Sequence, residues 1–159
     1  SKFARSRSNR LPSLASNPAF VAYAIITVVL CLNLLVVWNM SGGARGKTKT
    51  TPNPEDAKTV SKGAEVVTAD PPEVQRVVRV HRNAADTITP FLFLGLVYVI
   101  LGASALMAQI LFGVFAFARW GHSIAYLKGL QPWRTILYFI GVLATLGVMG
   151  DIVRLLLAH

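Results

Sequence analysis

The sequence predicts an all-α integral membrane protein built as a four-helix bundle, and two observations carry that prediction. Hydrophobic residues make up 53% of the 159 residues, and they gather into runs long enough to cross a bilayer. Charged residues are only 14%, and most lysines and arginines stand between these runs or just inside them, as in membrane proteins. The net charge of +9 therefore follows membrane topology, which argues against a nucleic-acid partner.

The first apolar run covers residues 18–40 and carries no charge, and a helix of about 20 such residues spans the hydrocarbon core. Asn33 is polar within this run, so we expect it to face a neighbouring helix rather than lipid. Residues 41–43, Ser-Gly-Gly, are expected to end the helix. A basic tail, residues 1–17, precedes it. Cys31 is the single cysteine, which excludes a disulfide within the chain and a cysteine metal cluster.

A polar loop, residues 41–72, separates the first helix from the second. Within it, Asn53 starts the motif Asn-Pro-Glu-Asp, which predicts a helix start with Asn53 as the cap and acids in the first turn. The second helix is predicted over residues 73–102. Its first part is amphipathic and its continuation is apolar, so it begins in water and enters the membrane. Pro90 is expected to kink it.

The remaining apolar sequence is long enough for two more passes, predicted over residues 107–127 and 133–157. Ten lysines and arginines fall on the side of the first and third loops, against five on the opposite side. We therefore expect those two loops to face the cytosol or its equivalent. The endoplasmic reticulum, an organelle or a bacterial inner membrane would each fit this multi-pass topology, with membrane lipid as a direct partner.

Three of the predicted helices carry polar side chains at spacings of three and four residues, which place them on one face of each helix. They are Arg79, Arg82, Asn83 and Asp86 on the second helix, Arg119, His122 and Tyr126 on the third, and Arg134, Thr135 and Tyr138 on the fourth. If successive helices cross the membrane in opposite directions, all three clusters lie at the same depth in the membrane. Ionisable groups near hydrocarbon mark function by default, and this excess of arginine indicates an anionic ligand.

A structural role is the alternative for these charges. Asp86 could pair with Arg82 or Arg119 to hold the helices together, and Arg134 could be an anchor that reaches the interface from a helix end. His122 alone is more often an interhelical donor than a catalyst. No second histidine or acid completes a metal site, so no bound metal is predicted.

Two sequence blocks resemble the MAPEG superfamily, the membrane-associated proteins in eicosanoid and glutathione metabolism. They are residues 76–98, RVVRVHRNAADTITPFLFLGLVY, and residues 119–138, RWGHSIAYLKGLQPWRTILY. The motif at 53–56, and Arg45 eight residues before it, also match in spacing the branch that contains microsomal prostaglandin E synthase and microsomal glutathione transferase 1. The resemblance implies a homotrimer of four-helix subunits, with glutathione as the cofactor between neighbouring subunits near the cytosolic face.

Carried over by position, the resemblance implies a set of glutathione ligands. They are Arg45, Arg82, Asn83, Asp86, His122, Tyr126, Arg134, Thr135 and Tyr138. Arg134 and Thr135 occupy the places of the arginine and serine that handle the glutathione thiol, and Asp56 matches an aspartate implicated beside them. Four positions depart from the family pattern: Thr135 replaces serine, Asp86 replaces glutamate, Ala84 stands where an aspartate is usual, and Thr89 replaces an aromatic or apolar residue before the proline.

The function implied by the resemblance is a glutathione-dependent transferase or isomerase, in which the glutathione thiolate attacks a lipophilic electrophile that arrives from the bilayer. Glutathione conjugation, peroxide reduction and prostaglandin E synthesis are all compatible with this chemistry. The alternative is a non-catalytic role, in which the fold serves as an accessory or scaffold subunit of a larger membrane complex. The basic N-terminal tail would then be a docking arm.

Overall fold

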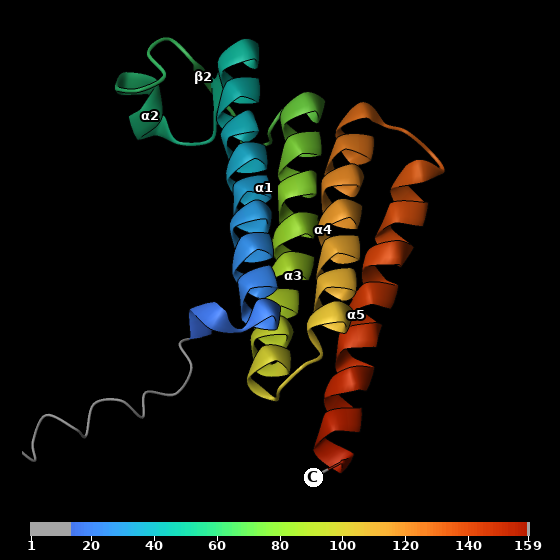
Figure 1. The fold of residues 1–159 in the computed structure, drawn as a ribbon. Helices are drawn as coiled ribbons and strands as arrows, with labels where there is room; N and C mark the ends of the chain where they lie inside the picture. Colours follow the sequence, from blue (N-terminus) through green and yellow to red (C-terminus); the bar gives the residue numbers. More distant parts are fainter. Residues whose placement is uncertain (1–13, 159) are drawn as a thin grey trace, which may run out of the picture.

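The computed structural model describes residues 14–158, and four long helices dominate this part of the chain (Figure 1). They are α1 (Pro18–Thr48), α3 (Pro72–Ile100), α4 (Ala105–Lys128) and α5 (Trp133–Leu157). Each is long and apolar enough to cross a membrane, which confirms the predicted all-α membrane bundle. The predicted basic tail falls mostly on residues outside the described part.

The helix α1 begins at a side-chain cap, where Asn17 Oδ1 accepts a hydrogen bond from the backbone nitrogen of Ala19 at 2.9 Å. A short 3₁₀ helix, η1 (Leu14–Ser16), precedes it. At its other end, α1 runs on to Thr48, so the predicted end at residues 41–43 is wrong. Tertiary contacts outweigh the low helix propensity of the glycines there, because Ala44 packs against a small core cluster.

The segment between α1 and α3 contains a short two-stranded parallel sheet and one helical turn. Strands β1 (Thr50–Thr51) and β2 (Glu65–Val66) pair with each other, and α2 (Pro54–Lys58) lies between them in sequence. Asn53 occupies the position before α2, but its side chain makes no cap bond and instead donates to Asp56 Oδ2 at 2.9 Å. The predicted helix start is confirmed there, while the predicted capping bond is absent.

The connections place two loops at one end of the bundle and one turn at the other (Figure 1). The α1–α3 segment and the α4–α5 turn lie at the same end, as the alternating passes predicted. At the opposite end, Gly102 turns the chain from α3 into α4 with a φ of 81°, a conformation that glycine adopts without a steric penalty. All the charged clusters of the predicted site therefore belong to one half of the molecule.

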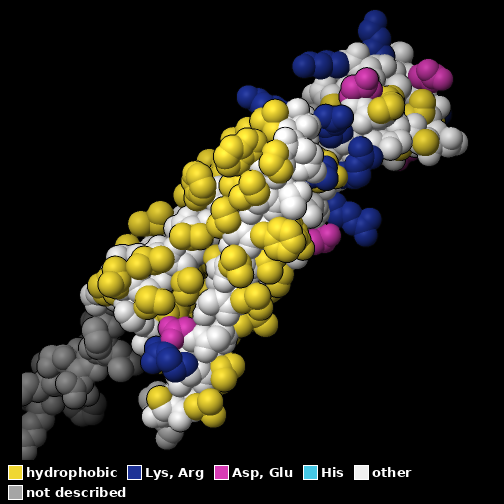
Figure 2. All heavy atoms as spheres, turned by 90° about the vertical axis from the view of Figure 1, so that its right-hand side faces the viewer, with side chains coloured by type: hydrophobic (Ala, Val, Ile, Leu, Met, Phe, Trp, Pro, Cys, Tyr) yellow, Lys and Arg dark blue, Asp and Glu magenta, His cyan; other side chains and the backbone are white. Residues whose placement is uncertain are grey.

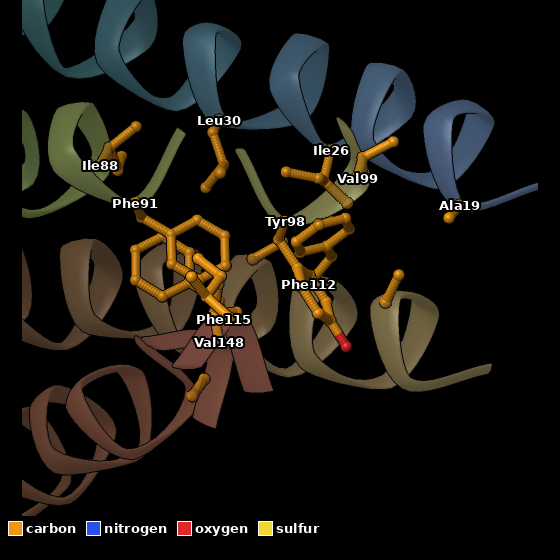
Figure 3. Close-up of a cluster of buried hydrophobic side chains, with 14 of the residues drawn as sticks. Ala19, Ile26, Leu30, Ile88, Phe91, Tyr98, Val99, Phe112, Phe115 and Val148 are labelled. Atoms are coloured by element: carbon orange, nitrogen blue, oxygen red, sulfur yellow. The ribbon is translucent and has the colours of Figure 1, made fainter. Parts of the chain in front are cut away.

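Aromatic side chains fill the centre of the bundle (Figure 3). The rings of Phe91 and Phe115 stack with their centroids 3.5 Å apart, and Phe112 meets Phe91 and Tyr98 edge to face. Leu30 of α1 closes this core from one side. Because the core is continuous from α1 to α5, it holds α3, α4 and α5 at fixed positions beside the polar clusters.

A polar link ties α3 to α5 at the end that carries the α3–α4 turn. The Tyr98 hydroxyl donates to Asp151, and Asp151 also forms an ion pair with Arg154 one turn further along α5. Tyr98 is fully buried, so this bond joins two helices inside the bundle and restricts how far they can separate there.

The outer surface of the helices is apolar over most of its length (Figure 2). Only 22% of the most hydrophobic window of α1 and 17% of that of α5 are buried within one chain. These two helices therefore present their apolar faces to lipid or to another chain. Most lysines and arginines gather beyond the apolar body at one end of the molecule.

Candidate functional site

The turn between α4 and α5 brings together the aromatic and basic residues predicted on these two helices. Gly129 ends α4 in the left-handed conformation, and α5 begins four residues later. As a result, the Arg134 guanidinium lies over the Tyr126 ring, 4.7 Å from its centroid. The His122 ring contacts Tyr126 at 5.7 Å and Tyr138 at 6.2 Å between ring centroids. We call these residues, together with Arg119 of α4 and with Arg82, Asn83 and Asp86 of α3, the polar layer.

A glutamine in the same turn connects the two residues expected to handle a thiol. The side-chain amide of Gln131 lies 3.1 Å from Thr135 Oγ1. When the amide is oriented with its oxygen towards Arg134, that oxygen accepts from Nε at 3.2 Å and from Nη2 at 2.8 Å. In that orientation Gln131 contacts both side chains, and the Arg134 guanidinium also has a cation–π contact with the Tyr126 ring.

Arg119 is the most buried charge of the polar layer, with 2% of its surface exposed. Its Nη1 donates to Thr87 Oγ1 at 2.7 Å, whereas Nε and Nη2 are buried without a hydrogen-bond partner in the described part of the chain. A Cβ atom at Gly141 would lie 3.3 Å from Nε, so glycine lets the guanidinium approach the backbone of α5 closely. The buried guanidinium therefore has donors that one chain does not satisfy.

The two charged α3 residues of the polar layer, Arg82 and Asp86, face outwards. Arg82 and Asp86 form a long ion pair of 3.9 Å, with 84% and 68% of their side chains exposed, so it contributes little to stability. Within the described residues, Asp86 makes no ion pair with Arg119. The structure therefore lacks the Asp86–Arg119 pair that would have held α3 and α4 together. Asn83 Oδ1 is buried without a partner.

A cleft opens between α3 and α5, with α4 as its floor, and its volume is about 180 Å³. We call it the α3–α5 cleft. Its polar end is lined by Asp86, Thr87, Arg119 and Tyr138, and its mostly apolar end by Pro90, Phe115, Val142 and Leu146. Gly141 and Thr145 complete the lining, and the Thr145 hydroxyl donates to the Gly141 carbonyl. The cleft thus joins the polar layer to the hydrophobic part of the bundle.

Two of the predicted site residues lie away from the polar layer in a single chain. Arg45 forms a two-bond ion pair with Asp70, with Nε–Oδ1 at 3.2 Å and Nη2–Oδ2 at 2.8 Å. Asp56 belongs to α2, which Figure 1 shows on the far side of α1 from α5. One chain therefore brings Asp86, Arg119 and Tyr138 to one cleft and places Arg134 over Tyr126, while Arg45 and Asp56 lie elsewhere.

Sequence reasoning missed three residues that shape this site: Thr87, Gln131 and Gly141. Thr87 lies four residues after Asn83, so helical spacing could have placed it on the polar face of α3. Gln131 and Gly141 carry no such signal, because their roles depend on how closely α4 and α5 approach each other.

The fold and this polar layer define an integral membrane four-helix protein with a cationic, hydrogen-bonding site at one end. Residues 23–154 match the model of the MAPEG family, and the chain belongs to that family.

Named relatives cover most of the chain. Human prostaglandin E synthase is 38% identical over 129 residues, which is 80% of this chain and 84% of that protein. The horse prostaglandin E synthase is 39% identical over 135 residues, 83% of this chain and 87% of that protein. Rat microsomal glutathione S-transferase 1 is 32% identical over 147 residues, 91% of this chain and 95% of that protein. By name these relatives are enzymes, and one of them uses glutathione.

Proposed function

We propose that this protein is a glutathione-dependent membrane transferase or isomerase that acts on a lipophilic electrophile. The observation that carries the proposal is the charge balance of the polar layer. Arg119 contacts the Tyr138 ring and Arg134 the Tyr126 ring, and His122 lies against both rings. Asp86 is the one acid that lines the cleft beside Arg119 in the described part of the chain, and the exposed Arg82 is its partner. Such an excess of cations next to hydrocarbon favours a negatively charged, polar ligand.

The polar layer fits glutathione chemically. Glutathione carries two carboxylates, one ammonium group and two amides, so it needs several cationic donors and a few acceptors. The buried Nε and Nη2 of Arg119 and the buried Oδ1 of Asn83 lack partners within the described residues. The exposed Arg82 and Asp86 add one charge of each sign. Arg82, Asn83, Asp86, His122, Tyr126 and Tyr138 would hold the peptide.

Arg134 and Thr135 are the residues proposed to handle the thiol. When bound, glutathione supplies a sulfur nucleophile in its thiolate form. An ordinary thiol has a pKa of about 8.5, and lowering it by two units takes roughly 2.7 kcal/mol of differential stabilisation. The Arg134 charge favours the anion, and the Thr135 hydroxyl can donate a hydrogen bond to it. Gln131 orients both side chains by its contacts with them.

A homotrimer accounts for the residues that a single chain does not bring together. The apolar faces of α1 and α5 are largely uncovered. Arg45 lies near the end of α1, and Asp56 lies in α2, which Figure 1 shows on the far side of α1 from α5. We propose that these two residues complete the site of a neighbouring subunit. Detergent-solubilised protein should then sediment as three chains.

Replacing Arg134 tests the assignment. Arg134→Leu removes the charge beside the thiol, and losing about 2.7 kcal/mol corresponds to roughly a hundredfold lower rate of conjugation. A halogenated aromatic, a lipid hydroperoxide and a prostaglandin endoperoxide should be assayed in parallel, which also identifies the reaction type. Arg79→Gln is the matched control, because among the described residues the exposed Arg79 side chain hydrogen-bonds to Gln75 and to no residue of the polar layer. Undiminished turnover in Arg134→Leu would contradict the proposal.

The scaffold role is the second candidate, and one observation favours it. Arg134 is already engaged by Gln131 and Tyr126, and Arg45 by Asp70, so part of the site is satisfied internally. Calorimetry on the solubilised protein separates the two functions. The enzyme should bind glutathione, whereas an absence of binding at millimolar concentrations would favour a non-catalytic accessory subunit.

A further inference from the structure

A second cavity, with a volume of about 460 Å³, lies beside the loop that Figure 1 shows on the far side of α1 from α5. We call this cavity the loop pocket. Arg45 and Gly46 line it from the end of α1, Lys49 lines it just beyond that helix, and residues 60–64 line it from the segment between α2 and β2. It shares no lining residue with the α3–α5 cleft.

Backbone hydrogen bonds hold the two walls of the loop pocket together. The backbone nitrogen of Glu65 donates to the carbonyl of Lys49 at 2.9 Å, and that of Ala64 donates to the carbonyl of Ser61 at 2.9 Å. Gly63 permits the second of these bonds, because its φ of 79° is a conformation that glycine adopts without a steric penalty. The cavity is therefore formed by two fixed backbone segments.

Lys49 holds an unusual backbone conformation in the wall of the loop pocket. Its φ of 52° and ψ of 42° are left-handed, which is unfavourable for a residue with a side chain. The bond from Glu65 and the bond from the Lys49 nitrogen to the Arg45 carbonyl keep it there. Conformations of this kind gather at ligand sites, where the surrounding structure compensates for their cost.

The charge of the loop pocket is unbalanced. Three of its lining side chains are basic and none is acidic. Arg45 is already paired with Asp70. Among the described residues, neither Lys49 nor Lys62 forms an ion pair. Membrane topology requires positive charge on this side of the bilayer, but it does not require two free ammonium groups at one cavity. Their arrangement favours an anionic ligand.

The depth of the loop pocket indicates a lipid as the source of that anion. The apolar run of α1 ends at Met40, and Arg45 and Lys49 follow about 8 and 14 Å further on at 1.5 Å per residue. The head-group layer adds roughly 5–8 Å on each side of the hydrocarbon, so the pocket lies at its outer edge. Val60 in the lining is 87% exposed, and an apolar contact suits a lipid better than a soluble ion.

We propose that the loop pocket binds the head group of an anionic phospholipid. Lys49 and Lys62 hold the phosphate oxygens, and the Ser61 hydroxyl, which lines the same cavity, donates a hydrogen bond to them. The acyl chains stay in the bilayer beside α1. The proposal is independent of the proposed function, because it needs neither glutathione nor the polar layer and gives the charge of Arg45 no role.

Native mass spectrometry of the full chain in a non-ionic detergent, titrated with dioctanoyl phosphatidylglycerol, tests this proposal. We expect saturable binding that Lys49→Ala and Lys62→Ala each weaken at least about fivefold. Lys47→Ala removes an exposed lysine of α1 that does not line the loop pocket, and it should bind the lipid normally. Dioctanoyl phosphatidylcholine has no net charge and should bind more weakly; equal binding of the two lipids would overturn the proposal.

Substitutions at Gly46 test the same pocket without removing a lysine. A Cβ atom there would meet nothing within 4 Å, so Gly46→Glu adds a carboxylate to the lining without a steric conflict. Gly46→Gln has the same shape without the charge, and it should bind phosphatidylglycerol at least about fivefold more tightly than Gly46→Glu. Unchanged binding in both lysine variants, or equal binding by Gly46→Glu and Gly46→Gln, would overturn the proposal.

Competition at constant ionic strength distinguishes a lipid from a soluble anion. Neither inorganic phosphate nor glutathione, at millimolar concentrations, should displace phosphatidylglycerol. Displacement by phosphate would identify a site for soluble anions, and displacement by glutathione would assign the loop pocket to the glutathione site; either result overturns the proposal. Lipid binding that depends on Lys49 and Lys62 and resists both competitors supports it, whether or not the proposed enzyme activity is found.

Discussion

Replacing Asp70 by asparagine tests whether Arg45 is available to bind a ligand. In the structure, Asp70 holds the Arg45 guanidinium through two bonds of 3.2 and 2.8 Å. Asp70→Asn keeps the shape of this contact but removes the negative charge. If Arg45 contributes to glutathione binding from a neighbouring subunit, the freed guanidinium should bind the ligand more strongly.

The size of the effect follows from the exposure of the pair. The side chains of Arg45 and Asp70 are 30% and 18% exposed, so solvent screening leaves an interaction of about 1 kcal/mol or less. Releasing Arg45 from that interaction should raise glutathione affinity by up to about fivefold. The gain should shrink at high salt, because partly exposed charges are screened.

Isothermal titration calorimetry with glutathione measures this gain directly. The same change made in an Arg45→Ala background should leave affinity unaltered, since the arginine that Asp70 restrains is then missing. An affinity that falls or stays constant in Asp70→Asn, in protein of normal thermal stability, would refute the role given to Arg45.

Two core substitutions test the packing around the polar layer. Phe91→Ala removes a fully buried ring and should lower the free energy of unfolding in detergent by about 3 kcal/mol. This is the lower end of the usual range, because lipid already solvates separated helices. A loss below about 0.5 kcal/mol would contradict the packing described. Gly95→Ala would place a Cβ 3.2 Å from Tyr23 and 3.3 Å from Phe112, and crowding between two rings should cost about 1–3 kcal/mol. Gly113→Ala, where a Cβ meets nothing within 4 Å, should be neutral or stabilising by up to about 1 kcal/mol in the same unfolding assay.

The four passes could be predicted because a bilayer imposes a length and a hydropathy that are visible in the sequence. The end of α1 could not. Gly42 and Gly43 indicate a helix end locally, but the packing of Ala44 and the Arg45–Asp70 pair stabilise the helix further on. Those contacts join segments that are distant in sequence, so the helix propensities of the local residues do not predict them.

The composition of the polar layer could likewise be predicted from helical spacing, whereas the state of each charge could not. Asp86 had three possible roles in the sequence: a partner for Arg82, a partner for Arg119 or a ligand. Only side-chain geometry shows that it pairs loosely with Arg82, leaving two nitrogens of Arg119 without an acceptor. The cleft beside Arg119 also depends on the separation of α3 and α5, which no local pattern encodes.

We propose that the polar layer stabilises the thiolate of bound glutathione through Arg134 and Thr135. Ultraviolet difference absorbance, recorded as glutathione is titrated into solubilised protein at neutral pH, measures thiolate formation without requiring the natural electrophile. We expect a thiolate signal that saturates with glutathione, falls in Thr135→Val and disappears in Arg134→Leu, while Arg79→Gln retains it. Bound glutathione that stays fully protonated, or a thiolate signal that is unchanged in Arg134→Leu, would contradict it.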